Sequence, residues 1–206
     1  MLKLYYTPGT CALASHIALE EAGAAYTTER VDFKTNQQNS PEYLAINPKG
    51  RVPALVTDRG VLTETPAMLA FIAQSFPLAK LAPLGDAFAF AQVQAFNSYL
   101  CSTLHVAHAH GRRGYRWASE ESSFADMKRK VPETFGAGLT LIERDMLKGP
   151  WVMGQDYTIC DPYLFTLGLW LEGNSVDPLT VPKVMEHRRR MQERPAVRKV
   201  LADERG

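Results

Sequence analysis

The segment Asn47–Pro66, NPKGRVPALVTDRGVLTETP, decides how this chain folds. Within it, Ala54-Leu55-Val56 is a short β-type run that begins just after Val52-Pro53. A proline next to a strand has to sit at the start or the edge of that strand, because it cannot donate to the ladder. Asp58-Arg59-Gly60 then predicts a tight turn into a second short strand. The segment therefore predicts a β-hairpin that starts at the Val-Pro pair.

The end of the same segment predicts a ligand site. Glu64-Thr65-Pro66 places a carboxylate, a capping hydroxyl and a proline where a helix is expected to begin, with Pro66 at its first position. The backbone N–H groups of a helix start favour a bound carboxylate, while Glu64 can hold an amine. If the Val52-Pro53 bond is cis, the backbone of Val52 faces outward and can pair with an extended ligand. These features predict a receptor for a short zwitterionic peptide.

The residues before this segment alternate between strand and helix signals. Leu2–Tyr6 is strand-like, Cys11–Ala22 has an apolar helical face, and Tyr26–Phe33 returns to a β-rich pattern. A strand–helix–strand order implies a parallel first pair of strands. With the hairpin and a helix from Pro66 to about Ser75, this half reads as an α/β domain.

Beyond residue 86 the signals are almost all helical. We predict domains at residues 1–78 and 87–206, joined by a linker at 79–86 within the stretch Phe76–Asp86, which has two prolines, a glycine and no clear period. The second domain is expected to contain helices at Ala87–Ala109 and, kinked or reset at Pro132, Ser122–Leu147. Three shorter helices are expected at Thr158–Leu171, Val181–Gln192 and Pro195–Asp203.

One helix start in the second half carries a capping signal. Thr158-x-x-Asp161 is a capping box with aspartate in the usual glutamate position. We interpret this motif as a determinant of folding and not of catalysis. The basic clusters at Arg112-Arg113 and His187–Arg190 are interpreted as solvated faces of helices and turns.

Composition excludes several functional classes. The chain has 206 residues, 46% of them hydrophobic, and a formal net charge of +1, so neither nucleic acid nor membrane is an expected partner. No apolar run reaches the roughly 18 residues of a membrane span. Three widely spaced cysteines argue against a disulfide framework. We expect a cytoplasmic protein without a signal peptide.

Cys11 is the first candidate for chemistry. It follows a Pro-Gly-Thr turn and begins a helix, where the positive end of the helix dipole favours a thiolate. The alternative is a buried, inert thiol, because cysteine is often a core residue. Three residues further on stands Ala14, so Cys11 has no local resolving cysteine, and any redox chemistry must pass through a mixed disulfide.

Histidines form the second candidate group. His105, His108 and His110 lie close together, but their spacing does not place all three on one face of a helix. No carboxylate or cysteine in the same stretch completes a ligand set, so no metal site is expected.

Four motifs in order resemble the glutathione S-transferase superfamily. They are LKLYYTPGTC at Leu2–Cys11, NPKGRVPAL at Asn47–Leu55, LTET at Leu62–Thr65 and DYTICD at Asp156–Asp161. The first of these, together with His105, is similar to the bacterial beta class. The resemblance covers nearly the whole chain and implies a thioredoxin-like N-terminal domain followed by an all-α C-terminal domain.

The resemblance also implies a set of site residues. Catalysis is assigned to Cys11 and to His105, which in this class faces the glutathione thiol across the domain cleft. The expected glutathione-binding residues are Tyr6, Cys11, Asn36, Val52, Pro53, Glu64, Thr65, Ser102 and His105. The alternative for Tyr6 is a role in packing alone, and the alternative for Ser102 is a solvent-exposed serine on a helix.

Some positions depart from the family pattern. Asn36 stands where a glutathione-contacting lysine is expected, with Lys34 two residues earlier, and Val106 also replaces a lysine. Ala12 and Ser98 replace the usual serine and asparagine. The loss of the two lysine contacts would weaken charge pairing with the carboxylates of glutathione.

The implied activity is conjugation of glutathione, as co-substrate and without a metal, to hydrophobic electrophiles that enter past Tyr99, Tyr115 and Trp117. A homodimer with a role in detoxification is typical of the family. Two alternatives stay open. One is a glutathione-dependent disulfide reductase or peroxidase that works through a Cys11 mixed disulfide, and the other is a non-catalytic binding module of the same fold.

Overall fold

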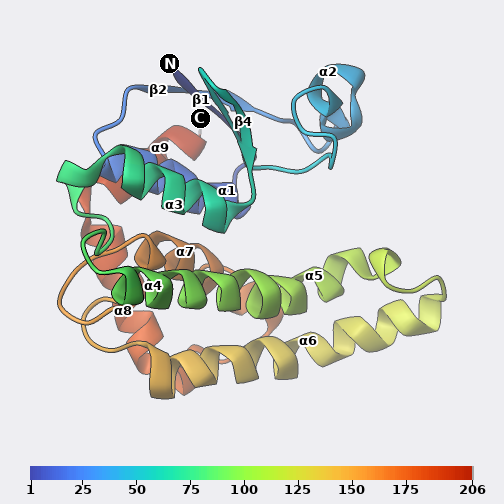
Figure 1. Ribbon diagram of the computed structural model, residues 1–206. Helices are drawn as coiled ribbons and strands as arrows, with labels where there is room; N and C mark the ends of the chain where they lie inside the picture. Colours follow the sequence, from blue (N-terminus) through green and yellow to red (C-terminus); the bar gives the residue numbers. More distant parts are fainter. Residues whose placement is uncertain (206) are drawn as a thin grey trace. The chain divides into compact units, whose positions relative to one another are not determined.

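Figure 1 shows the computed structural model, which describes residues 1–205. The chain divides into two compact units. The first unit contains Met1–Ala91 and the C-terminal segment that begins at Gln192, and the second unit is Gln92–Met191. The domain limits predicted above, 1–78 and 87–206, stay a prediction. Within residues 1–205 no helix combines the length and the apolar character needed to cross a membrane.

The first unit is built on a four-stranded sheet. Its strands are β1 (Leu2–Tyr6), β2 (Tyr26–Arg30), β3 (Ala54–Thr57) and β4 (Gly60–Thr63), in the spatial order β2-β1-β3-β4. β1 runs parallel to β2 and antiparallel to β3, while β3 and β4 form a hairpin. The predicted parallel pair and the predicted hairpin are both confirmed.

Helix α1 (Ala12–Glu21) is the most enclosed element of the first unit. It lies beside α3 (Thr65–Ser75) on one side of the sheet (Figure 1), and α9 (Pro195–Arg205) packs against it as well. Every residue from Cys11 to Leu19 is buried. The sequence predicted a single apolar face, but a helix that is covered all round needs this almost wholly apolar composition.

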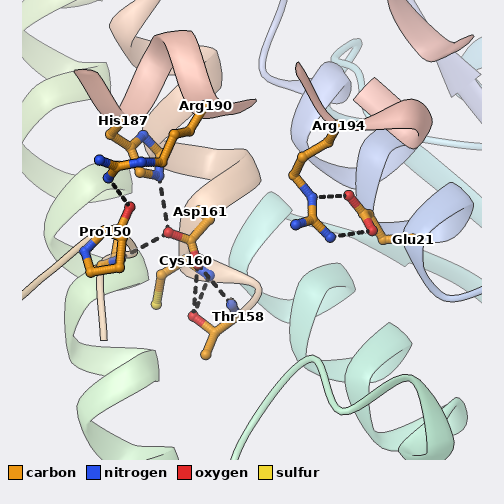
Figure 2. A network of polar contacts seen from close by, with 9 residues as sticks. Glu21, Pro150, Thr158, Cys160, Asp161, His187, Arg190 and Arg194 are labelled. Atoms are coloured by element: carbon orange, nitrogen blue, oxygen red, sulfur yellow. Dashed lines mark hydrogen bonds and ion pairs between the residues drawn. The ribbon is translucent and has the colours of Figure 1, made fainter. Parts of the chain in front are cut away.

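Ion pairs fix α9 and the residue before it to α1. Arg194 binds the carboxylate of Glu21 through two nitrogens, at 2.5 and 2.8 Å (Figure 2), and Lys199 binds Glu20 at 2.6 Å. His16 Nδ1 lies 3.0 Å from Glu204 Oε1, and both side chains are almost fully buried. The bidentate pair of Arg194 with Glu21 and the buried pair of His16 with Glu204 therefore fix the position of α9 against α1.

The second unit is helical. Its main helices are α4 (Ala87–Tyr99, which begins in the first unit), α5 (His105–Arg113), α6 (Glu121–Leu141), α7 (Cys160–Gly168) and α8 (Pro182–Glu193). α5 and α6 run side by side (Figure 1). Residues 1–205 also include the short helix α2 (Pro41–Leu44) and single 3₁₀ turns at Gln37–Asn39, Pro77–Ala79, Gly114–Arg116, Glu172–Asn174 and Pro178–Thr180.

Two helices differ from their predicted course. The helix expected at Ala87–Ala109 is interrupted by a π-helical turn at Leu100–Leu104, which separates α4 from α5. α6 continues through Pro132 as one helix to Leu141, where a second π-helical turn begins, so the proline does not reset it.

Asp161 is the polar centre of the second unit. Its side chain is completely buried and accepts hydrogen bonds from the backbone N–H groups of Thr158 at 2.7 Å and Val152 at 2.8 Å. His187 Nε2 lies 2.9 Å from the same carboxylate (Figure 2). The half of the capping box in which Asp161 accepts from the N–H of Thr158 is therefore confirmed, and the carboxylate also ties the preceding loop and α8 to the start of α7.

The prediction that His187 belongs to a solvated face was wrong. Its side chain is about 1% exposed and points to Asp161, whereas Arg189 of the same cluster pairs with Glu186 in solvent. The cluster reads as uniformly basic in the sequence, but His187 lies on the buried face of α8 together with Val184 and Met191.

A stacked pair of rings holds α5 to the end of α7. His108 stacks on Trp170 with ring centroids 4.3 Å apart, and its Nδ1 lies 3.0 Å from Asn174 Oδ1. Asn174 Nδ2 donates to the carbonyl of Trp170, so Oδ1 is the atom that accepts, and His108 carries its proton on Nδ1. Burial lowers the pKa of His108, since the charged ring would lose its hydration.

Replacing Asp161 with alanine leaves buried backbone donors without an acceptor. We expect Asp161→Ala to lower the free energy of unfolding by about 3 kcal/mol or more, the scale for removing one partner of a buried, charged network. Chemical denaturation monitored by circular dichroism measures this change. Asp177→Ala is the matched control, because Asp177 caps a short helix at an exposed site and its loss should be much smaller. Equal losses in the two variants would contradict the central role of Asp161.

The lowered pKa of His108 predicts a pH dependence of stability. The ring is protonated in the unfolded chain once the pH falls below 6.5, the ordinary pKa of histidine, while the folded chain takes up the proton only at a lower pH. The contribution of His108 to stability is therefore fully present above pH 6.5 and is lost as the pH falls below that value. His108→Phe keeps an aromatic ring at this position but cannot titrate. We expect the loss in free energy of unfolding between pH 7.5 and pH 5.5 to be larger in the wild type than in this variant. Identical losses would show that His108 does not contribute.

Candidate functional site

The strand register brings several predicted site residues to one end of the sheet. Ala54 of β3 pairs with Tyr5 of β1 on one side and with Thr63 of β4 on the other. Because both pairs are antiparallel, the residues one step further, Tyr6, Pro53 and Glu64, come together at the same end. The start of α1, with Cys11, follows the turn after Tyr6.

Cys11 lies at the start of α1 and faces the Val-Pro segment. Its side chain is 8% exposed, and its Sγ lies 3.7 Å from the carbonyl oxygen of Val52. The preceding turn is held by Thr10, whose hydroxyl donates to the carbonyl of Thr7 and accepts from the N–H of Ala12. The turn therefore presents the thiol at a defined position beside Val52.

The Val52-Pro53 peptide bond is cis, as the sequence-based binding model requires. The paired residues of β3 begin at Ala54, so Val52 stands before the ladder. The loop that leads into it is held at Arg51, whose carbonyl accepts from Tyr43 Oη and Asn47 Nδ2, each at 2.6 Å. These hydrogen bonds hold the segment before β3 in a defined conformation.

Glu64 precedes α3, which begins at Thr65, one residue earlier than predicted. Glu64 itself is the capping residue, with a φ of 70° that is uncommon for a side chain of this size. The Nζ of Lys49 lies 2.5 Å from Glu64 Oε1 and 2.7 Å from Thr63 Oγ1. Thr65 is 4% exposed, so its hydroxyl is less accessible than the carboxylate beside it.

Two other predicted residues of the first unit have local roles in the structure. The Asn36 side chain accepts from Gln38 and Asn39, which closes its own turn. Tyr6 packs its ring against His16, with centroids 5.5 Å apart, and burial raises the pKa of its hydroxyl. Tyr6 therefore stays protonated at neutral pH.

His105 is the first residue of α5, directly after the π-helical turn. Its ring makes a T-shaped contact with Trp170 at a centroid distance of 5.1 Å, and Trp170 is also the ring on which His108 stacks. Ser102 is exposed inside the π-helical turn, where the wider helix changes the angle between residues three apart. Ser102 and His105 are therefore not related as residues three apart in a regular α-helix, which would share one face.

The three histidines of α5 contact two different tryptophans. His105 and His108 contact Trp170, whereas His110 packs on Trp117 at 4.3 Å. Among residues 1–205 no three histidine, cysteine or carboxylate side chains group in a way that could hold a metal ion.

Sequence reasoning missed two residues that the structure places beside predicted ones. Lys49 was noted only as part of the motif NPKGRVPAL, and its approach to Glu64 follows from the loop geometry. Trp170 had no signal at all, since it lies 65 residues beyond His105 and its contact is tertiary.

Comparison with known proteins bears on both units. Residues 1–74 match the family "Glutathione S-transferase, N-terminal domain". Glutathione S-transferase GstA of Escherichia coli O157:H7 is 33% identical over 206 residues, which cover 98% of each chain.

Solved structures agree with this relationship. A glutathione transferase homologue from Sulfitobacter with bound glutathione is 48% identical, with a TM-score of 0.95 and 98% of each chain covered. The bacterial beta class glutathione S-transferase of Sphingomonas chungbukensis is 31% identical, with a TM-score of 0.85 over 98% of each chain. With a relative more than 30% identical along almost its whole length and the fold shared throughout, this chain belongs to the glutathione S-transferase family.

Proposed function

We propose that the protein is a glutathione S-transferase of the beta type, which conjugates the thiolate of glutathione to hydrophobic electrophiles. The family relationship supports the transferase activity. The finer assignment is carried by one observation, the Cys11 thiol 3.7 Å from the carbonyl oxygen of Val52 at the peptide-binding edge.

Glutathione binds in an extended form in this proposal. Its cysteinyl backbone pairs with Val52, Pro53 turns the chain into the sheet, and its γ-glutamyl end is held by Glu64 and Thr65. The strand register supports this arrangement, because it brings Pro53 and Glu64 to neighbouring positions. The Sulfitobacter relative was solved with glutathione bound, which supports glutathione as the co-substrate.

The chemistry requires glutathione as a thiolate. The start of α1 carries a partial positive charge, which favours a negative sulfur near Cys11. His105 is the second proposed catalytic residue and hydrogen-bonds or polarises the glutathione sulfur. The thiolate attacks the electrophilic carbon, a C–S bond forms, and the leaving group departs with the electron pair of its bond. Tyr6, Asn36 and Ser102 remain proposed contacts of the tripeptide.

The electrophile, the assembly and the compartment complete the proposal. Tyr115 and Trp117 expose 65% and 47% of their surface, which suits an apolar co-substrate. We propose a homodimer and a cytoplasmic location, in line with a role in detoxification.

A glutathione-dependent disulfide reductase is the second candidate. Cys11 supports it, because its thiol lies at the proposed glutathione site, whereas Cys160 is fully buried and burial raises its pKa. In this reaction the Cys11 thiolate attacks a mixed disulfide of glutathione and forms Cys11–S–S–glutathione, while the substrate thiol leaves. A second glutathione then releases oxidised glutathione and restores the thiol.

Incubation with oxidised glutathione should modify Cys11. We expect intact-protein mass spectrometry to show a gain of one glutathione, which is lost on addition of reductant. Cys11→Ala should show no adduct, and Cys101→Ala is the matched control, because Cys101 is partly exposed whereas Cys11 and Cys160 are buried. An adduct that persists in Cys11→Ala and disappears in Cys101→Ala would overturn the assignment of Cys11 to the thiol site.

The two candidate activities separate in the same Cys11→Ala variant. Conjugation to 1-chloro-2,4-dinitrobenzene should fall by about tenfold, the effect of one lost hydrogen bond to the glutathione sulfur. Reduction of a mixed glutathione disulfide should vanish, because its covalent intermediate cannot form. If conjugation is absent in the wild type while disulfide reduction is present, the reductase is the function of this site.

A further inference from the structure

We propose that Lys49 is a further binding residue for glutathione, which exchanges its ion pair with Glu64 for the α-carboxylate of the γ-glutamyl group. This inference rests on the proposed function, since it concerns the same site. It assigns the binding of the α-carboxylate of the γ-glutamyl group to Lys49, in the loop before β3.

The ion pair occupies the carboxylate that is proposed to hold the ligand's amine. Lys49 Nζ lies 2.5 Å from Glu64 Oε1 and 2.7 Å from Thr63 Oγ1. The side chains of Lys49 and Glu64 are 41% and 60% exposed, so an incoming molecule can reach both charges. An exposed pair of this kind contributes little to folding stability, and opening it costs little.

The loop holds Lys49 in place before any ligand binds. The N–H of Lys49 donates to Asn47 Oδ1 at 3.2 Å, and Asn47 is 1% exposed. The next residue, Gly50, has a φ of 58°, and a Cβ there would lie 2.8 Å from Asn39 Oδ1. The turn therefore requires glycine after Lys49, and its backbone is fixed while only the long side chain can move.

The chemistry of the ligand matches the pair. A γ-glutamyl group carries an ammonium and a carboxylate on one carbon atom, and Glu64 and Lys49 present the opposite charges next to each other. When the ligand's ammonium takes the place of Lys49 on Glu64, Lys49 becomes a cation beside the ligand's carboxylate. One ion pair is thereby replaced by two.

The start of α3 supplies few other donors for that carboxylate. Pro66, the second residue of the helix, has no N–H, so Thr65 and Ala67 are the residues that can offer one in the first three positions. A nearby ammonium offsets this deficit. Lys49 fits that role because its Nζ already lies beside Thr63 and Glu64, at the end of β4 that leads into α3.

Calorimetric titration of the full chain tests the inference. The ligands are glutathione and two analogues, 4-aminobutyryl-cysteinyl-glycine, which lacks the α-carboxylate, and glutaryl-cysteinyl-glycine, which lacks the α-amine. In Lys49→Gln we expect the affinity for glutathione and for the glutaryl analogue to fall about tenfold, the effect of losing a charged hydrogen bond. The affinity for the aminobutyryl analogue should be unchanged or higher, because Glu64 is no longer paired.

Lys3→Gln is the matched control, since Lys3 also forms an exposed ion pair with a glutamate in the first unit, and its affinities should equal those of the wild type. Unchanged or tighter binding of glutathione by Lys49→Gln would overturn the inference, as would equal losses for glutathione and the aminobutyryl analogue. In both cases the wild type still binds glutathione, and the proposed function stands. A wild type that binds none of the three ligands overturns the proposed function and the inference with it.

Discussion

Helix α1 has no face left for solvent, and the first unit is organised around that constraint. The residues from Cys11 to Leu19 are all buried, so the helix needs cover on every side. The sheet and α3 supply part of it, and α9 supplies the rest from the far end of the chain. Because Cys11 stands at the start of this helix, the position of its thiol is set by packing along the whole of α1.

The sequence predicted those parts of the fold whose determinants are local. β1 was predicted with its observed limits, and the hairpin followed from Pro53 and the turn at Gly60. The capping box at Asp161 was also visible, because its two residues are three apart. The cover of α1 by α9 was not predictable in this way, since the pairs of Glu21 with Arg194 and His16 with Glu204 join residues more than 170 positions apart.

The candidate site shows the same division. Val52, Pro53 and Glu64 belong to one hairpin, so their proximity follows from its register and could be expected from the sequence. The altered relation of Ser102 to His105 could not, because an inserted π-helical turn leaves no mark in hydrophobic spacing. The position of Lys49 could not be predicted for a different reason. Its charge was evident, but the turn that directs its side chain toward Glu64 depends on the buried Asn47 and on a positive φ at Gly50.

The two-part composition of the first unit has a consequence for the order in which the protein is made. During synthesis Met1–Ala91 emerges from the ribosome first. Helix α9, which covers α1 in the same unit, emerges only after the whole of Gln92–Met191. Domains generally fold as units during synthesis, with the N-terminal one first. Here the second unit is complete in one continuous stretch and can fold while the growing chain still exposes one side of α1. The docking of α9, which covers His16 and the helix that carries Cys11, therefore follows the synthesis of the second unit.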